Sequence, residues 1–212
     1  MKPGPPYRVG LTGTVAAGKS AVARRLAEWG ATVIDSDELA RELVQPGFPA
    51  FAGIRDAFGE DVIGSDGTID REVLGRLVFE DDAARATLER ISHSGIRELR
   101  ARLIAEATAA GARVIVEEVP LLFEVGLEAD YDVIVVVDAP QPLRQARART
   151  SRGWSAERFA AIDAAQLPGT EKRRRAHRVL DNAGKPEELD AAVRELWKAV
   201  LSAAAEGRED LE

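Results

Sequence analysis

The sequence of 212 residues contains no cysteine and only two histidines, His93 and His177. The lack of cysteine excludes disulfides, thiolate metal sites and cysteine nucleophiles, and two histidines are too few for a histidine-rich metal site. The most apolar run, Val133 to Val137, is far too short to span a bilayer. The first residues also lack the apolar core of a signal peptide. We therefore expect cytoplasmic residence and no membrane partner.

Basic residues are fewer than acidic ones, 29 against 36, and the formal net charge is −7. This balance argues against general nucleic-acid binding, which needs an excess of cationic surface. Two local basic clusters are nevertheless present, Arg144, Arg147, Arg149 and Arg152, and then Lys172, Arg173, Arg174, Arg175 and Arg178. They fit the binding of a small polyanion. For most of these residues taken singly, a solvated helix face with i,i+4 partners is the preferred interpretation.

Apolar runs alternate with helical patterns, which is typical of a parallel α/β sheet. The near-continuous Val/Ile content predicts strands covered on both faces, at 8–12, 32–35, 113–119, 132–137 and 178–180. Helices are expected between them, at 20–29, 95–110, 140–151 and 186–204. A chain of this length accommodates one α/β domain with a modest insertion. No convincing strand occurs from about Asp37 to His93, which we interpret as a helical insertion, and a second insertion runs from 152 to about 175.

One motif carries the strongest chemical signal. Residues 13–20 match the phosphate-binding pattern G-x-x-x-x-G-K-[ST] in full, between a strand pattern and an amphipathic helix. Backbone N–H groups of such a loop converge on one spot and favour negative charge there. Lys19 would lie against the β- and γ-phosphates, and Ser20 would ligate Mg²⁺. The residues predicted to bind ATP here are Gly13, Thr14, Val15, Ala16, Ala17, Gly18, Lys19 and Ser20.

Carboxylates follow two of the predicted strands. Asp35 and Asp37 end the second strand, and because carboxyl ends of strands face the ligand crevice, one of them could accept a proton from an acceptor hydroxyl. The alternative is that Asp37 caps a helix starting at Glu38. An acid ending the third strand, Glu117 or Glu118, could hold the water shell of the metal. A solvated strand end is the alternative there.

A P-loop alone does not separate a kinase from a switch or a regulator. A switch GTPase would usually carry N-K-x-D, which is absent. Arginines after the fourth strand, Arg147 and Arg152, could reach the phosphates from a mobile cover that excludes water. The pattern therefore favours a small-molecule kinase. Two alternatives stay open: another small-acceptor kinase of nucleoside or nucleotide type, or a nucleotide-binding regulatory NTPase.

These pieces, in this order, resemble bacterial dephospho-coenzyme A kinase from about Val9 to about Leu196. Beyond the P-loop, the resemblance rests on Val33-Ile34-Asp35-Ser36-Asp37 with Ala40-Arg41, Pro46-Gly47, Phe58-Gly59, Asp66-Gly67, Asp70-Arg71, Val78-Phe79, His93, Pro120-Leu121-Leu122-Phe123-Glu124, Gln166 and Asp181-Asn182-x-Gly184. The family transfers phosphate from ATP to the ribose 3′-hydroxyl of dephospho-CoA, the last step of CoA synthesis.

The resemblance implies a P-loop NTPase fold with a five-stranded parallel sheet flanked by helices. It divides the chain into a nucleotide-binding core at 1–36, 94–151 and 176–212, a helical acceptor-binding insertion at 37–93, and a lid at 152–175. It makes Asp37 the general base, with Lys19 and Arg147 completing the catalytic set, and selects Glu118 as the Mg²⁺ carboxylate, acting through water. It adds Arg147, Asn182 and Gly184 to the ATP site and assigns the acceptor to Asp37, Arg41, Phe79, His93, Pro120, Leu121 and Glu124.

The chain departs from the family's pattern at several positions. The interior of the P-loop, Thr14 to Ala17, usually contains more glycine. Ser94 stands where proline commonly follows His93, so a buried structural histidine is an alternative there. Arg144 replaces a common glutamine, and His177 replaces a common aspartate.

Overall fold

The computed structural model describes residues 5–209, and side chains from 5 to 206. The predicted core also includes 1–4 and 210–212, which lie outside the described residues. The chain forms two compact units, one made of 1–35 with 106–212 and the other of Ser36–Ala105. The predicted division at residue 93 falls inside a long helix that crosses this boundary, α5 (Asp82–Ala109).

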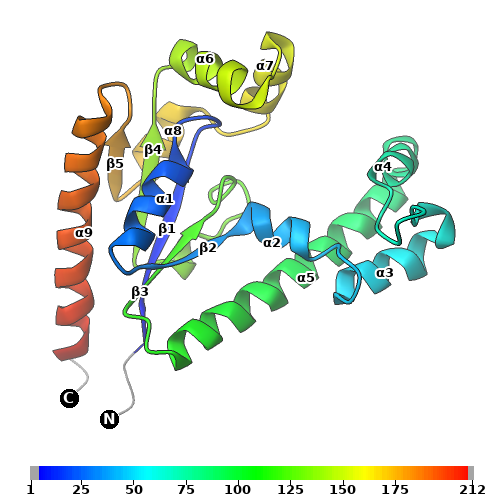
Figure 1. Ribbon diagram of the computed structural model, residues 1–212, viewed down its shortest axis with the longest axis horizontal. Coiled ribbons are helices and arrows are strands. Elements are labelled where there is room, and N and C mark those ends of the chain that lie inside the picture. Colours follow the sequence, from blue (N-terminus) through cyan, green and yellow to red (C-terminus); the bar gives the residue numbers. More distant parts are fainter. Residues whose placement is uncertain (1–4, 210–212) are drawn as a thin grey trace. The chain divides into compact units, whose positions relative to one another are not determined.

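The first unit is built on a five-stranded parallel sheet of order β2-β3-β1-β4-β5 (Figure 1). This confirms the predicted fold class. The strands are β1 (Tyr7–Gly13), β2 (Thr32–Asp35), β3 (Val114–Glu118), β4 (Val133–Asp138) and β5 (Arg178–Asp181).

Both faces of the sheet are covered, as the apolar runs predict. Along β4, Val135 and Val137 belong to one core cluster, whereas Ile134 and Val136 belong to another. Successive side chains of a strand point to opposite faces, so the two clusters lie on the two sides of the sheet. Every residue of β3 is buried.

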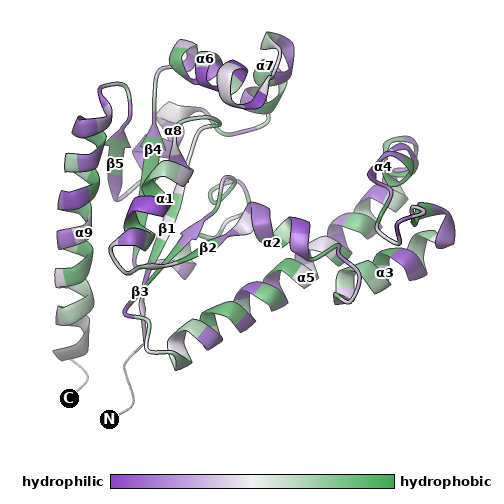
Figure 2. Cartoon of the chain, in the orientation of Figure 1, coloured by the Kyte–Doolittle hydropathy of each residue, from purple (hydrophilic) through white to green (hydrophobic). Residues whose placement is uncertain are grey.

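Two helices, α1 (Lys19–Glu28) and α9 (Pro186–Glu209), contribute eight of the 17 buried residues in the first cluster, beside those of the strands. Hydrophilic and hydrophobic residues alternate in bands along α9 (Figure 2). Its buried residues recur every three or four positions, which places them on one helical face against the sheet: Leu189, Val193, Leu196, Val200 and Ala204.

The predicted lid segment follows α6 (Gln141–Arg152) and contains α7 (Ala156–Ala164) and α8 (Gly169–Arg175). Phe159 of α7 and Ala148 of α6 are buried together with Val15 of the P-loop. The short helical turns η1 (Glu60–Val62) and η2 (Glu128–Asp130) complete the elements of the chain, together with the helices of the second unit.

The second unit is helical, with α2 (Ser36–Glu42), α3 (Pro49–Phe58), α4 (Arg71–Glu80) and most of α5. Its core is formed by Ile54, Val62, Ile69 and Leu74. Within its described residues, pairing of extended backbone is limited to one isolated bridge, Ile63–Ile69.

The predicted start of the long helix at Gly95 is wrong, because α5 begins at Asp82. Asp81 caps it, with Oδ1 accepting from the N–H groups of Ala83 (2.7 Å) and Ala84 (3.2 Å). Gly95 lies inside the helix for a packing reason, since a Cβ there would come 2.6 Å from Leu43 Cδ1. Among the described residues, no helix is long and apolar enough to cross a membrane.

Candidate active site

The P-loop lies between β1 and α1, and the geometry at two of its positions, 13 and 18, requires glycine. Gly13 has φ 146°, and a Cβ there would lie 2.0 Å from the carbonyl oxygen of Val137. Gly18 has φ 103°, and its Cβ would lie 2.3 Å from Asn182 Nδ2. Both positions combine a left-handed backbone with close neighbours, so neither accepts a side chain without rearrangement.

The side chain of Lys19 folds back over this loop. Its Nζ donates to the carbonyl oxygens of Gly13 and Thr14, at 3.2 Å each, and the residue is buried. The ammonium charge is therefore held at the loop, where it favours the binding of an anion.

Ser20 and Glu118 meet at the carboxyl end of the sheet. Ser20 Oγ donates to Glu118 Oε1 at 3.0 Å. Glu117, its neighbour on β3, is fully buried and pairs with Arg8. The geometry thus separates the two acids: Glu118 is next to the P-loop, and Glu117 joins β3 to β1. Mg²⁺ bound with a nucleotide usually has only one or two oxygen ligands from the protein, because phosphates and water supply the others. A hydroxyl beside a carboxylate fits this requirement.

Arg147 and Asn182 form a chain of hydrogen bonds that ends on the P-loop. Arg147 Nη2 donates to Asn182 O (2.9 Å) and approaches Asn182 Oδ1 (3.4 Å), while Asn182 Nδ2 donates to Ala17 O at 2.8 Å. Arg147 Nη1 is buried without a hydrogen-bond partner. A buried guanidinium donor left unpaired is costly, so this atom fits a bound anion. Gly184 lies in the exposed loop between β5 and α9.

Glu124 is tied to the lid segment. It forms an ion pair with the fully buried Lys172 at 2.9 Å, and its Oε1 accepts from the N–H of Leu167 at 2.8 Å. Burial acts to raise the pKa of Glu124, but the hydrogen bonds from Lys172 and Leu167 outweigh it and the pKa is lowered. Lys172 also donates to Pro120 O at 2.8 Å.

The solvated-face interpretation is wrong for two members of the basic clusters. Lys172 is fully buried, and Arg144 is 6% exposed and pairs with Asp163. Sequence reasoning missed both as site-forming residues, because a run of cations gives no sign of which member turns inward. A signal was present for Arg144, which stands where the family commonly has glutamine.

Five of the other predicted acceptor residues are exposed, and the sixth, Pro120, is half-buried. Asp37 and Arg41 are exposed on α2 and Phe79 is 87% exposed on α4, whereas Leu121 is 42% exposed in the first unit. The capping interpretation of Asp37 is wrong, because α2 begins at Ser36 and places Asp37 inside its first turn. His93 is exposed on α5, so the alternative of a buried structural histidine is wrong as well.

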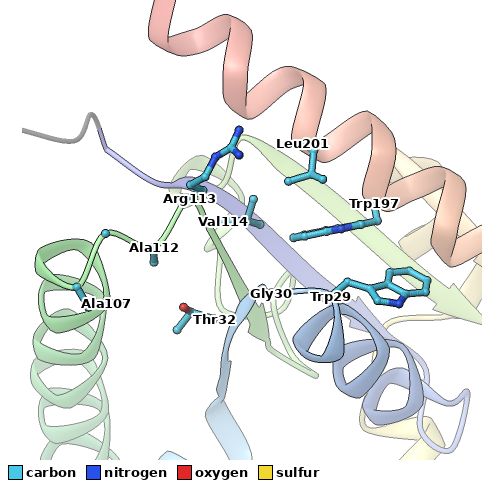
Figure 3. Close-up of a pocket in the computed structure, with 11 residues that line it drawn as sticks. Trp29, Gly30, Thr32, Ala107, Ala112, Arg113, Val114, Trp197 and Leu201 are labelled. Atoms are coloured by element: carbon cyan, nitrogen blue, oxygen red, sulfur yellow. The ribbon is translucent and has the colours of Figure 1, made fainter.

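A separate hollow of about 450 Å³ lies at the opposite end of the sheet, beside the first residues of β2 and β3. Trp29, Trp197, Leu201 and Arg113 line it (Figure 3). None of the predicted site residues is among those that line it.

A family model described as dephospho-CoA kinase matches residues 7–188, which include the P-loop and every predicted site residue. The chain belongs to the dephospho-CoA kinase family. A dephospho-CoA kinase from Deinococcus radiodurans is 47% identical over 196 residues, covering 90% of this chain and 93% of the relative. One from Frankia casuarinae is 43% identical, covering 92% and 84%.

Solved structures agree with this family fold. TT1252 from Thermus thermophilus has a TM-score of 0.78 at 37% identity, covering 94% of this chain and 98% of that one. Dephospho-CoA kinase from Campylobacter jejuni has a TM-score of 0.66 at 23% identity, covering 91% and 98%. Shikimate kinase from Acinetobacter baumannii, at 0.53 and 16%, shares the fold alone.

Proposed function

We propose that this chain transfers the γ-phosphoryl group of ATP to the ribose 3′-hydroxyl of dephospho-CoA, giving CoA in the last step of its synthesis. The observation that carries this proposal is the family match, which covers residues 7–188. Relatives at 43–47% identity over about nine-tenths of this chain are dephospho-CoA kinases. The chain is accordingly an ATP-dependent kinase that acts in CoA synthesis.

The nucleotide side of the site is proposed to work through the P-loop. Amide N–H groups of residues 13–20 bind the phosphates, and Lys19 stabilises the charge that spreads over the transferring group. Arg147 supports this role, because its buried Nη1 has no hydrogen-bond partner and would gain one from an anion. Asn182 holds Arg147 in place, and Gly184 lies in the same loop, where we assign the adenine.

We infer that Ser20 binds Mg²⁺ directly and that Glu118 binds it through water, on the basis of their 3.0 Å contact. The metal ion, when bound with ATP, neutralises charge on the β- and γ-phosphates. The chain's own residues do the rest of the positioning.

The acceptor side is proposed to depend on Asp37. Its carboxylate accepts the proton of the 3′-hydroxyl as the oxygen bonds to the γ-phosphorus, and the bond from that phosphorus to the β–γ bridging oxygen breaks to release ADP. Arg41, Phe79, His93, Pro120, Leu121 and Glu124 are assigned to holding the acceptor. Cytoplasmic residence, and the absence of nucleic-acid and membrane partners, stay predictions from the sequence.

An acceptor panel tests the proposal against its alternatives. ADP release is measured with ATP and Mg²⁺ alone, with dephospho-CoA, and with nucleosides, nucleotides and shikimate as other hydroxyl acceptors. We expect release that depends on dephospho-CoA and yields CoA. Release with another acceptor alone would favour a different small-acceptor kinase, and release without any acceptor would favour a regulatory NTPase.

A further inference from the structure

The P-loop contains an alanine in a backbone conformation that suits glycine. Ala16 has φ 57°, and it alone among the non-glycine residues of 5–209 has a positive φ. A Cβ makes this left-handed region unfavourable, and glycine avoids that cost. The neighbours of Ala16 in the loop, Val15 and Ala17, are not glycine either. Something other than backbone freedom must therefore stabilise the loop in this shape.

Val15, the residue before Ala16, is held at three points. Its N–H donates to Gln166 Oε1 at 2.9 Å, and its carbonyl oxygen accepts from Arg144 Nη1 at 3.3 Å. Its side chain is 6% exposed and packs with Ala148 and Phe159. The two hydrogen bonds fix the peptide groups on both sides of Val15.

The bond from Arg144 bears directly on Ala16. The carbonyl of Val15 and the N–H of Ala16 belong to one planar trans peptide and point in opposite directions. A flip of this peptide toward a negative φ at Ala16 would turn the Val15 oxygen away from Arg144. The same bond thus sets the direction of the Ala16 N–H, which is one of the loop amides.

Arg144 is itself rigidly placed. It pairs with Asp163 through two contacts, Nη1 to Oδ1 at 2.5 Å and Nη2 to Oδ2 at 3.4 Å. Its Nε donates to Ala139 O at 3.0 Å, and its guanidinium lies 5.6 Å from the centre of the Phe159 ring. An arginine fixed by a carboxylate, a carbonyl and an aromatic ring can orient a backbone group that it contacts.

We propose that Arg144 and Gln166 are positioning residues for ATP binding, which hold the peptides flanking Val15 so that Ala16 keeps its left-handed conformation. Two departures from the family's usual sequence, the non-glycine loop interior and the arginine at 144, are then parts of one device. The inference rests on the proposed function in that ATP is taken as the nucleotide.

The test measures the dissociation constant of Mg·ATP without acceptor for Arg144→Gln and Asp163→Asn, each with and without Ala16→Gly. A hydrogen bond from a charged group predicts that Arg144→Gln weakens ATP binding about tenfold or more. Ala16→Gly in the same chain should reduce that factor to about threefold, because glycine adopts a positive φ unaided. Asp163→Asn removes the ion pair but leaves the donor to Val15, so it should weaken binding less than Arg144→Gln.

A purely structural role would give a different pattern. Arg144→Gln and Asp163→Asn would then lower the melting temperature alike and weaken ATP binding alike, and Ala16→Gly would not help. That result overturns the proposal, as does unchanged ATP binding in Arg144→Gln.

Gln166→Met provides a second route if Arg144→Gln fails to fold, since it keeps the side-chain length and removes the amide whose Oε1 accepts from Val15. We expect it to raise the ATP dissociation constant several-fold and leave the KM for dephospho-CoA unchanged, whereas wild-type ATP binding would overturn the role of Gln166.

Because ATP binding is measured without acceptor, a wild-type protein that binds ATP but does not phosphorylate dephospho-CoA would contradict the proposed function and leave this inference testable.

Discussion

The two compact units differ in how their candidate residues are held. All buried polar or charged residues among those described belong to the first unit, and most of them contact the P-loop or the lid segment: Thr12, Thr14, Lys19, Glu117, Glu118, Arg144, Lys172 and Asn182. In the second unit, Asp37, Arg41, Phe79 and His93 are exposed. The predicted nucleotide side is thus buried within the first unit, whereas the predicted acceptor residues of the second unit lie at the surface. Variants in the two units should therefore fail in different ways.

The largest effect is expected for Lys19→Ala. Removing the ammonium that sits on the P-loop should lower kcat with dephospho-CoA by on the order of 10³, because charge on the transferring group loses its main protein cation. Coupled ADP release measures this. Lys198→Ala removes an exposed lysine of α9 and should leave kcat near wild type; a Lys19→Ala enzyme that turns over normally would contradict the assigned site.

Asp37→Asn should lower kcat by on the order of 10² through loss of the general base. The KM for ATP should hardly change, because the nucleotide side is held by the first unit. Glu38→Gln is the matched control, an exposed carboxylate in the same helical turn. Near-normal turnover in Asp37→Asn would remove the base assignment.

Glu124→Gln should act on stability within the first unit. It leaves the buried Lys172 without its ionic partner, which costs about 3 kcal/mol of unfolding free energy at neutral pH. The lowered pKa of Glu124 means that its stabilisation is present above the ordinary value of 4.5 and is lost as the pH falls through the folded value. The difference between wild type and variant should therefore shrink below about pH 4.5.

Urea unfolding from pH 7 to pH 3 would check this dependence. The control is Glu171→Gln, which removes an exposed pair with Arg174 in the same segment and should change stability little. An equal loss of unfolding free energy in Glu124→Gln and Glu171→Gln would show that the Glu124–Lys172 pair stabilises the fold no more than an exposed pair does.

The smallest effect is expected for Phe79→Ala in the second unit. An exposed ring contributes little to folding, so the melting temperature should stay within a few degrees of wild type. If the ring covers part of the acceptor, the KM for dephospho-CoA should rise about tenfold, from the loss of buried apolar area. Leu77→Ala, which shortens the other exposed apolar side chain of α4, provides the comparison. Unchanged acceptor kinetics would exclude Phe79 from the site.

The sequence predicts the sheet well because strands buried on both faces are nearly continuous in Val and Ile. It also predicts the P-loop, because two glycines, a lysine and a serine at this spacing, between a strand and a helix, rarely occur outside phosphate-binding loops. It does not predict where the long helix begins, since several aspartates precede that helix and the sequence does not show which of them caps it. Nor does the sequence predict the burial of Arg144 and Lys172. Their partners, Asp163 and Glu124, lie 19 and 48 positions away along the chain. Pairs this far apart in sequence are determined only by the tertiary fold.

The assignment of roles to the acceptor residues stays a prediction. The choice of Glu118 over Glu117 came from the family's pattern, and the alternation of side chains along β3 gives it a physical basis. Position 117 faces Arg8, and position 118 faces Ser20.

The segment from 152 to 175 is anchored at its middle and near its end. Asp163 is bonded to Arg144, Gln166 to the P-loop, and Lys172 to Glu124. If this segment acts as the predicted lid and moves when a nucleotide enters, some of these bonds must break and form again afterwards. We therefore expect ATP binding and ADP release, more than the chemical step, to limit kcat.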